Sequence, residues 1–415
     1  MSNLIGMGQK AKAAATALAL LSSREKDATL QALAVALEAA VPEILSANER
    51  DLQAAQTDGM SAAMQDRLRL SEERIAGVAG AVRELTALPD PSGVTTEGRI
   101  LPNGLQIAKV TVPLGVVGII FESRPNVTVD CAALCLKSGN ACILRGGKEA
   151  IHSNTALTAV MRRALQAAGL PADAVQLLED TSRETATAMM RLNDYIDVLI
   201  PRGGAGLIST VVQNSTVPVI ETGAGVCHAY IDAAADLEMA ADIVHNGKTS
   251  RPSVCNALEC CLVHKAVAAR FLPLLRERLN SHSVELRGCP ATCEILGGGA
   301  TQATGEDYGR EFFDQIMAVR VVDGIDEAIG HIRKHSTHHS EVIVTGDLAA
   351  ATRFTREVDS AAVYVNASTR FTDGGEFGLG AEIGISTQKL HARGPMGLRE
   401  LVSYKYLVTG SGQVR

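Results

Sequence analysis

Hydrophobic positions divide the chain into regions of different periodicity. Residues 11–88 are rich in Ala, Leu, Glu and Gln, with apolar side chains three or four positions apart, which predicts helices. Pro and Gly residues between 89 and 93 end this region. Residues 106–112 alternate between polar and apolar side chains, which is typical of a strand with one face exposed to solvent. We expect a protruding or intersubunit ribbon there.

From residue 114 onward, short continuous apolar runs alternate with helical segments. Such runs predict a parallel sheet that is buried on both faces. The five runs are 114–121, 141–144, 175–178, 196–200 and 217–220. We therefore predict a doubly wound α/β sheet of five strands. Turns that carry glycine or basic residues follow two of the runs, at 145–148 and 201–206, where an open sheet binds its ligands.

A second α/β pattern begins after about residue 235. A helix is expected at 236–245, followed by a polar loop at 246–256 and an apolar run at 258–263. Further helices are expected at 267–279, 325–334 and 348–358, strands at 341–345 and 362–365, and a glycine-rich loop at 371–384. The predicted fold class is therefore α/β, with two domains of this kind.

Composition narrows the choice of partner and compartment. The chain has 39 basic and 46 acidic side chains, a net charge of −7, which speaks against nucleic acid or an anionic membrane as partner. With seven Phe, six Tyr and no Trp, stacking platforms for bases are scarce. The nine cysteines predict reduced thiols in a cytosolic protein, and we expect neither a secretion signal nor a membrane span.

Cys255 differs from most other cysteines in its surroundings. It lies in the predicted polar loop, with Lys248 and Arg251 close in sequence, and positive charge favours the thiolate. Cys255 is therefore the candidate nucleophile, although a packing role stays open. Five cysteines sit in apolar segments and are expected to pack: Cys131, Cys135, Cys142, Cys260 and Cys261.

Two clusters raise the question of a metal ion. Cys289 and Cys293 lack the CxxC spacing and a second pair nearby. His335, His338 and His339 lack accompanying ligands at metal-binding spacing, so a solvated loop is the expected account. We predict no metal site.

Several blocks of sequence together resemble a known family. Pro113–Ile120, Lys137–Lys148, Glu221–Gly225 and Cys255 follow in the order and spacing of the aldehyde dehydrogenase superfamily, although the dinucleotide fingerprint GxGxxG is absent. Within it, the chain resembles the gamma-glutamyl phosphate reductase family across essentially its whole length. Four blocks carry this closer resemblance: Phe121–Asn126, Leu144–Ala150, Arg251–Ala257 and Ala392–Leu398.

The resemblance implies a domain organisation. A dinucleotide-binding domain would comprise residues 1–98, 114–221 and 386–401, and a catalytic domain with the nucleophilic cysteine would comprise 222–385. Residues 99–113 and 402–415 would pair as an oligomerisation ribbon. The implied assembly is a homo-oligomer, a dimer or a tetramer.

The resemblance also implies a reaction, the NADPH-dependent reduction of L-glutamyl 5-phosphate to glutamate 5-semialdehyde and phosphate in proline biosynthesis. Cys255 would form a thioester with the acyl group, and the Cys255 amide is a candidate oxyanion donor. A transient contact with glutamate 5-kinase, which makes the acyl phosphate, is a further implied partner. The alternatives are an oxidising NAD(P)-dependent semialdehyde dehydrogenase that releases a free acid, and a non-catalytic scaffold that binds nucleotide only.

Other residues receive roles from the same resemblance. Arg124 stands where oxidising members have a Pro-Trp-Asn element, so we expect it to bind the phosphate, with a structural ion pair as the alternative. Glu221 stands at the place of the general base; because this reduction needs no water, its role here is cofactor positioning or structure. The expected cofactor contacts are Arg145, Lys148, Gly203, Gly204 and Glu311, and the expected substrate contacts are Arg124, Arg251, Asn366, Thr369 and Arg370, for which a solvated loop at 365–371 is the alternative.

Overall fold

Two compact units make up the chain. A computed structural model describes residues 2–415, and the first unit comprises the chain up to Thr222 with Gly378–Gly384 and Met396–Arg415. The second unit comprises Gly223–Phe377 and Ile385–Pro395. The chain thus returns to the first unit at 378 and again at 396, whereas the family resemblance implied a single return at 386. Residues 389 and 393 stay with the second unit because Lys389 and Arg393 both pair with Asp359.

The first unit begins with helices, as its periodicity predicted. They are α1 (Ser2–Leu18), α2 (Ser23–Ala39), α3 (Val41–Thr57), α4 (Ala62–Leu68) and α5 (Glu72–Glu84). Ser22 caps α2 in a reciprocal capping box with Glu25, which stabilises the start of that helix. Among the described residues no single helix has the length and apolar character to cross a bilayer, and the pair α2 and α3, bent by 66°, meets that test only jointly.

A parallel sheet with strand order β5-β4-β3-β6 forms the core of the first unit. Its strands are β3 (Val116–Phe121), β4 (Ala141–Arg145), β5 (Val175–Leu177) and β6 (Val198–Arg202), and its helices are α6 (Asn126–Lys137), α7 (Ile151–Ala167), α8 (Arg183–Met189) and α9 (Ala205–Asn214). The expected fifth strand at 217–220 is wrong, because this segment makes a single bridge, between Val219 and Leu199.

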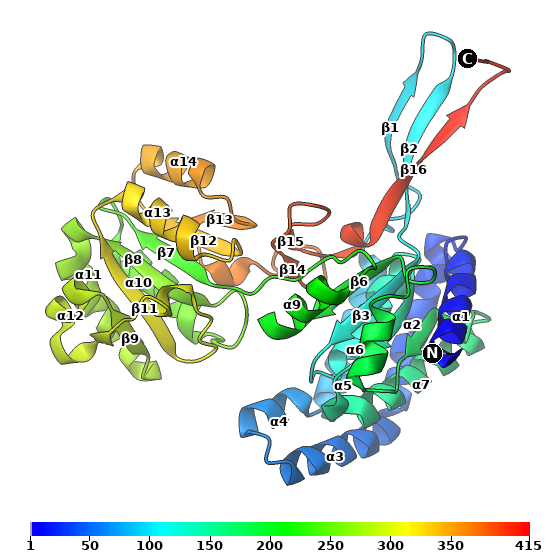
Figure 1. Ribbon diagram of the computed structural model, residues 1–415, viewed down its shortest axis with the longest axis horizontal. Coiled ribbons are helices and arrows are strands. Elements are labelled where there is room, and N and C mark those ends of the chain that lie inside the picture. The colour runs from blue at the N-terminus through cyan, green and yellow to red at the C-terminus, as the bar shows by residue number, and fades with distance from the viewer. Residues whose placement is uncertain (1) are drawn as a thin grey trace. The chain divides into compact units, whose positions relative to one another are not determined.

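An antiparallel ribbon extends from the first unit (Figure 1). It consists of β1 (Thr95–Ile100), β2 (Gln106–Pro113) and β16 (Val402–Thr409), in the order β1-β2-β16. Strand β16 pairs with β2 over its whole length, from Val402 opposite Pro113 to Thr409 opposite Gln106. Strands β2 and β16 lie within the two segments that the family resemblance paired, 99–113 and 402–415, whereas most of β1 lies before residue 99.

The second unit holds a seven-stranded parallel sheet, β10-β9-β11-β8-β7-β12-β13. The strands are β7 (Cys227–Ile231), β8 (Leu258–His264), β9 (Glu285–Gly288), β10 (Thr301–Gln302), β11 (Ile316–Val322), β12 (Ser340–Val344) and β13 (Ala362–Val365). The helices are α10 (Leu237–Thr249), α11 (Lys265–Leu279), α12 (Pro290–Leu296), α13 (Ile325–His335) and α14 (Leu348–Glu357), and a short hairpin is formed by β14 (Ile385–Ser386) and β15 (Gly394–Pro395). The α/β fold class is thus confirmed.

Successive residues of the central strands face opposite sides of this sheet. On β8, Cys261 belongs to the core that α10 and α11 cover, whereas Cys260 belongs to the core that α13 and α14 cover. This alternation follows from the pleat, which turns neighbouring side chains to opposite faces. Cys131, Cys135, Cys142, Cys260 and Cys261 are all buried free thiols, so the burial expected from their apolar sequence surroundings is confirmed.

Candidate active site

Cys255 lies in the loop between the end of α10 at Thr249 and the start of β8 at Leu258. Its side chain is half-buried, in contrast to the fully buried Cys227 nearby. The Cys227 thiol donates to the Cys255 carbonyl oxygen at 3.3 Å, which fixes the backbone at the candidate nucleophile. A cysteine in this setting is held in place while its thiol remains partly accessible, as a nucleophile requires.

The backbone of Gly225 packs directly against Cys255. A Cβ atom built at Gly225 would lie 1.5 Å from the Cys255 carbonyl oxygen, so no other residue fits at this position. The Gly225 amide donates to Oε1 of Glu311 at 2.5 Å. Burial raises the pKa of Glu311, and this hydrogen bond partly offsets the effect. The structure thus brings Glu311, one of the predicted cofactor contacts, to the backbone beside the nucleophile.

Asn256 organises the loop around Cys255. Its Nδ2 donates to the carbonyl oxygens of Thr372, at 2.9 Å, and Arg370, at 3.3 Å. Its Oδ1 accepts from the Arg370 guanidinium, and its carbonyl oxygen accepts from the Thr369 hydroxyl at 2.8 Å. We assigned no role to Asn256 from the sequence, although it directly follows Cys255 in the block that carries the family resemblance. Its place in this block was the sequence signal that could have identified Asn256 as a site residue.

Arg370 supplies the positive charge at this site. Burial lowers the pKa of its guanidinium and Arg251 lowers it further, whereas the Asp373 carboxylate and, after it, negative charge on Cys255 raise it. Lys248 was the other cation expected to favour the thiolate, and its Nζ lies 2.6 Å from the Glu259 carboxylate, with both side chains buried. Its charge is therefore matched by Glu259, which corrects the argument from sequence proximity. Glu259 itself was missed.

Two expected substrate contacts make their side-chain hydrogen bonds within the protein. Asn366 donates from Nδ2 to the Thr345 carbonyl oxygen and accepts the Thr345 amide at Oδ1, both at 2.9 Å. Thr369 is buried and donates to the Asn256 carbonyl oxygen. Thr369 therefore contacts the nucleophile loop through Asn256, whereas Asn366 bonds to Thr345 after β12.

In the first unit, the turn after β3 carries Glu122, Ser123 and Arg124. The Arg124 amide donates to the Glu122 carbonyl oxygen at 2.6 Å, which closes the turn before α6. The Glu122 carboxylate accepts the Gly204 amide at 3.0 Å, at the start of α9. A Cβ atom at Gly203 would lie 2.6 Å from the Glu122 carboxyl carbon. Glu122, which the sequence did not single out, therefore engages the glycine turn expected to face a phosphate.

Arg145 is the last residue of β4 and Lys148 follows it by three positions, at the carboxyl edge of the same sheet. Arg145 is half-buried, donates from Nη2 to the Thr181 carbonyl oxygen at 2.7 Å, and has a buried Nε with no hydrogen-bond partner among the described residues. Burial lowers its pKa, and the carboxylates of Glu149 and Asp180 oppose this effect. Lys148 is exposed. An orphaned guanidinium nitrogen beside an exposed ammonium fits an anionic group such as a cofactor phosphate.

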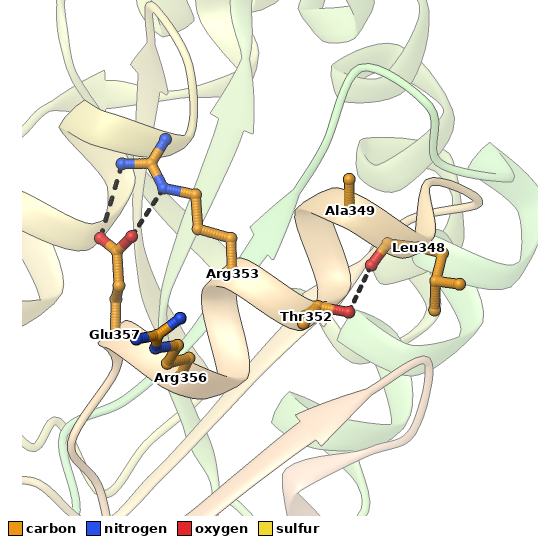
Figure 2. Close-up of a pocket in the computed structure, with 6 residues that line it drawn as sticks. All are labelled: Leu348, Ala349, Thr352, Arg353, Arg356 and Glu357. Carbon is orange, nitrogen blue, oxygen red and sulfur yellow. Dashed lines mark hydrogen bonds and ion pairs between the residues drawn. The ribbon is translucent and has the colours of Figure 1, made fainter.

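The predicted residues fall into two sets, one in each unit. Those in the second unit are Arg251, Cys255, Glu311, Asn366, Thr369 and Arg370; those in the first are Arg124, Arg145, Lys148, Gly203, Gly204 and Glu221. A separate open pocket lies along α14, lined by Leu348, Ala349, Thr352, Arg353, Arg356 and Glu357 (Figure 2). None of the predicted site residues lines it, and Arg353 and Glu357 pair with each other across one turn.

His335, His338 and His339, which we expected to form a solvated loop, differ in their exposure. His338 is exposed, but His339 is fully buried at the entrance to β12, and burial lowers its pKa to about 4. His335 packs its ring against His331, with centroids 4.5 Å apart. The expectation of solvent exposure was therefore wrong for His339, because β12 begins one residue later and draws it into the core.

The parallel α/β units and the cysteine loop before β8 define an aldehyde dehydrogenase. The family model described as "Aldehyde dehydrogenase family" matches residues 5–292. Gamma-glutamyl phosphate reductases from Heliobacterium modesticaldum and Carboxydothermus hydrogenoformans are 58% and 57% identical, over 100% of this chain and 99% and 100% of theirs. The crystal structure of gamma-glutamyl phosphate reductase from Thermotoga maritima has a TM-score of 0.97 at 47% identity, with 99% of each chain covered. The chain belongs to the gamma-glutamyl phosphate reductases of this family.

Proposed function

We propose that this chain reduces L-glutamyl 5-phosphate to glutamate 5-semialdehyde and phosphate with NADPH, a step of proline biosynthesis. The observation that carries the proposal is the half-buried Cys255, whose backbone is fixed by Gly225 and Cys227 beside the Arg370 cation. The names of the relatives support the substrate and the reaction.

Covalent catalysis divides the reduction into two easier steps. The Cys255 sulfur attacks the acyl carbon, the carbon–oxygen bond to phosphate breaks, and the thiol proton passes to solvent. The resulting thioester accepts hydride more readily than a carboxylate would, because it has no full negative charge. When bound, the nicotinamide would supply that hydride. The carbon–sulfur bond to Cys255 then breaks, which releases the semialdehyde and returns the sulfur to its thiolate. The Cys255 amide, as oxyanion donor, would contribute about 3 kcal/mol to each tetrahedral state.

The second unit offers positive charge for the substrate carboxylate. Arg251 is exposed next to the nucleophile loop, and Arg370 is held there by Asn256 and by the Ser250 hydroxyl at 3.0 Å. We assign substrate binding to these two arginines, and the shape of the adjoining wall to Asn366 and Thr369. Glu221 has no water to activate in this reaction, so we assign it to cofactor positioning.

Lys148 is expected to contribute to the choice of NADPH over NADH. An ammonium that meets the additional phosphate of NADPH forms a charge-assisted contact, so Lys148→Ala should lower kcat/KM for NADPH about 10- to 100-fold and leave that for NADH nearly unchanged. Steady-state kinetics with both nucleotides measure this, with Lys10→Ala as an exposed control. Equal efficiencies of the unaltered enzyme with the two nucleotides would contradict the assignment.

Arg124 is expected to bind the phosphate group that leaves. Its forked guanidinium suits a phosphate, so Arg124→Ala should lower kcat/KM for the acyl phosphate about 10- to 100-fold, and Arg124→Lys should restore only part of it. The reverse reaction should show a raised KM for phosphate. The control is Arg191→Ala, an exposed arginine of the same unit. Unchanged kinetics for both acyl phosphate and phosphate would leave Arg124 a structural role.

The ribbon is the proposed self-association element. Ile100 on β1 and Leu407 and Val408 on β16 are exposed apolar residues of the ribbon, which a contact with a second copy of the chain would bury. We infer a homo-oligomer, a dimer or a tetramer, which a solution mass measurement identifies.

The requirement for phosphate tests the proposed function. In the oxidation of glutamate 5-semialdehyde, the proposed enzyme should form NADPH only when inorganic phosphate is present. An oxidising dehydrogenase would form NADPH without phosphate and release free glutamate. A scaffold that only binds nucleotide would show no change of nicotinamide absorbance in either direction.

A further inference from the structure

Three neighbouring strands of the second unit align polar side chains on one face of the sheet. Across β12, β7 and β8, Glu341 pairs with His228, and His228 pairs with Cys260. All three are fully buried, with 0–1% of their surface exposed. The surrounding core on this face is apolar and includes Tyr230 and Ile343. Polar groups that are buried in an apolar core require hydrogen-bond partners or another polar ligand.

Helix α13 places a second histidine over this row. Nε2 of His331 lies 3.7 Å from the Cys260 sulfur, and the rings of His228 and His331 meet edge to face with centroids 5.5 Å apart. One ligand atom from each of His228, Cys260 and His331 lies within 4.8 Å of the others. In a tetrahedral zinc site with bonds of about 2.0–2.3 Å, ligand atoms are separated by about 3.3–3.8 Å. A small contraction therefore brings the three atoms to that spacing.

The ring of His228 is the second observation that points to a ligand. Neither ring nitrogen makes a hydrogen bond of good geometry within the described residues, although the side chain is completely buried. Nδ1 lies 3.2 Å from Oε2 of Glu341, which also accepts the His228 amide at 2.8 Å. A carboxylate beside one nitrogen of a histidine is the usual device that orients the other nitrogen toward a metal ion.

The ligand types of this cluster suit a soft or borderline cation. Imidazole and thiolate ligands together favour zinc over calcium or magnesium, which prefer oxygen.

We propose that His228, Cys260 and His331 supply three ligands of a buried Zn²⁺ site that joins β7, β8 and α13, with Glu341 orienting His228 and the fourth position left for a further ligand such as water. On binding, the S–H bond of Cys260 breaks, a Zn–S bond forms, and the proton passes to the buffer. No electrons are transferred. Cys255 is not one of these ligands, since it lies in the loop before β8 whereas Cys260 lies within β8.

Metal loading of the full chain tests the site. Because the ligands are buried, the protein is expressed or refolded with Zn²⁺ or Co²⁺ and then dialysed. We expect one metal ion per chain, a raised Tm, and a thiolate-to-Co²⁺ absorption band. Cys260→Ser and His331→Asn should weaken metal binding by more than the roughly 10–100-fold that is usual for a second-shell change. The matched control is Cys261→Ser, whose side chain faces the opposite side of β8.

The pattern of metal binding across the variants tests the proposed site. Retention of the metal in Cys261→Ser and in Cys255→Ser, with loss in the two ligand variants, supports it. Absence of stoichiometric metal in the unaltered chain, or loss of the Co²⁺ band in Cys255→Ser alone, overturns it. If the ligand variants do not fold, X-ray absorption of the zinc-loaded unaltered chain decides: one sulfur and two nitrogen ligands support the site, and a shell without sulfur overturns it.

Discussion

Cys255→Ala is expected to lower the rate of acyl phosphate reduction by about 10⁴-fold or more, because loss of a nucleophile removes the whole covalent route. The chain should remain folded, since the contacts that fix this residue are made by its backbone with Cys227 and Gly225. Loss of nicotinamide absorbance on mixing NADPH with L-glutamyl 5-phosphate measures the rate. The same variant should bind NADPH with unchanged affinity.

A burst experiment separates this role from a structural one. Without NADPH, the unaltered enzyme should release one phosphate per active site as the thioester forms, and Cys255→Ala should release none. Cys289→Ser is the matched control, because Cys289 is another half-buried thiol of the second unit. A burst that persists in Cys255→Ala, or disappears in Cys289→Ser, would contradict the assignment of the nucleophile.

The sequence predicted the fold class and the nucleophile loop because both depend on local signals. Continuous apolar runs mark buried parallel strands, as at β3 and β8, and the loop before β8 combines Pro, Ser and Cys between two regular elements. Strand β9 was missed because its four residues, Glu285–Gly288, include two charged side chains and one glycine. The segment 217–220 was mistaken for a strand because its apolar residues resemble one, although it is bridged only at Val219.

Other features depend on contacts between distant residues, which periodicity does not contain. The Glu122 carboxylate reaches the Gly204 amide, 82 positions along the chain, and Asn256 meets Arg370, 114 positions away. The row of Glu341, His228 and Cys260 exists only through strand register. Residues close in sequence can also have other partners. Lys248 lies seven positions before Cys255, yet its ammonium bonds to Glu259, the extra residue of β8 at the bulge between β7 and β8.

That buried ion pair carries the second large expected effect. Lys248→Met should destabilise the chain by about 3–5 kcal/mol, because it leaves the Glu259 carboxylate buried without its cation. Burial raises the pKa of Glu259 to about 7 even beside Lys248, and loss of the ammonium raises it further. The pKa of this carboxyl group is therefore higher in the folded than in the unfolded chain. Such a group lowers the free energy of unfolding as the pH rises from its unfolded pKa through its folded pKa. The deficit of Lys248→Met should therefore grow as the pH rises through neutrality, which denaturant unfolding at several pH values measures.

The double variant Lys248→Met/Glu259→Leu distinguishes charge from packing. Replacement of both partners by apolar residues removes the uncompensated carboxylate, so most of the lost stability should return, and the additional pH dependence should disappear. Lys265→Met is the matched single change, because Lys265 pairs with Asp323 on the exposed surface, and it should cost less than about 1 kcal/mol. If the double variant is as unstable as Lys248→Met, the lost stability comes from the packing of the lysine side chain. The unpaired charge of Glu259 would then not be the cause of the destabilisation.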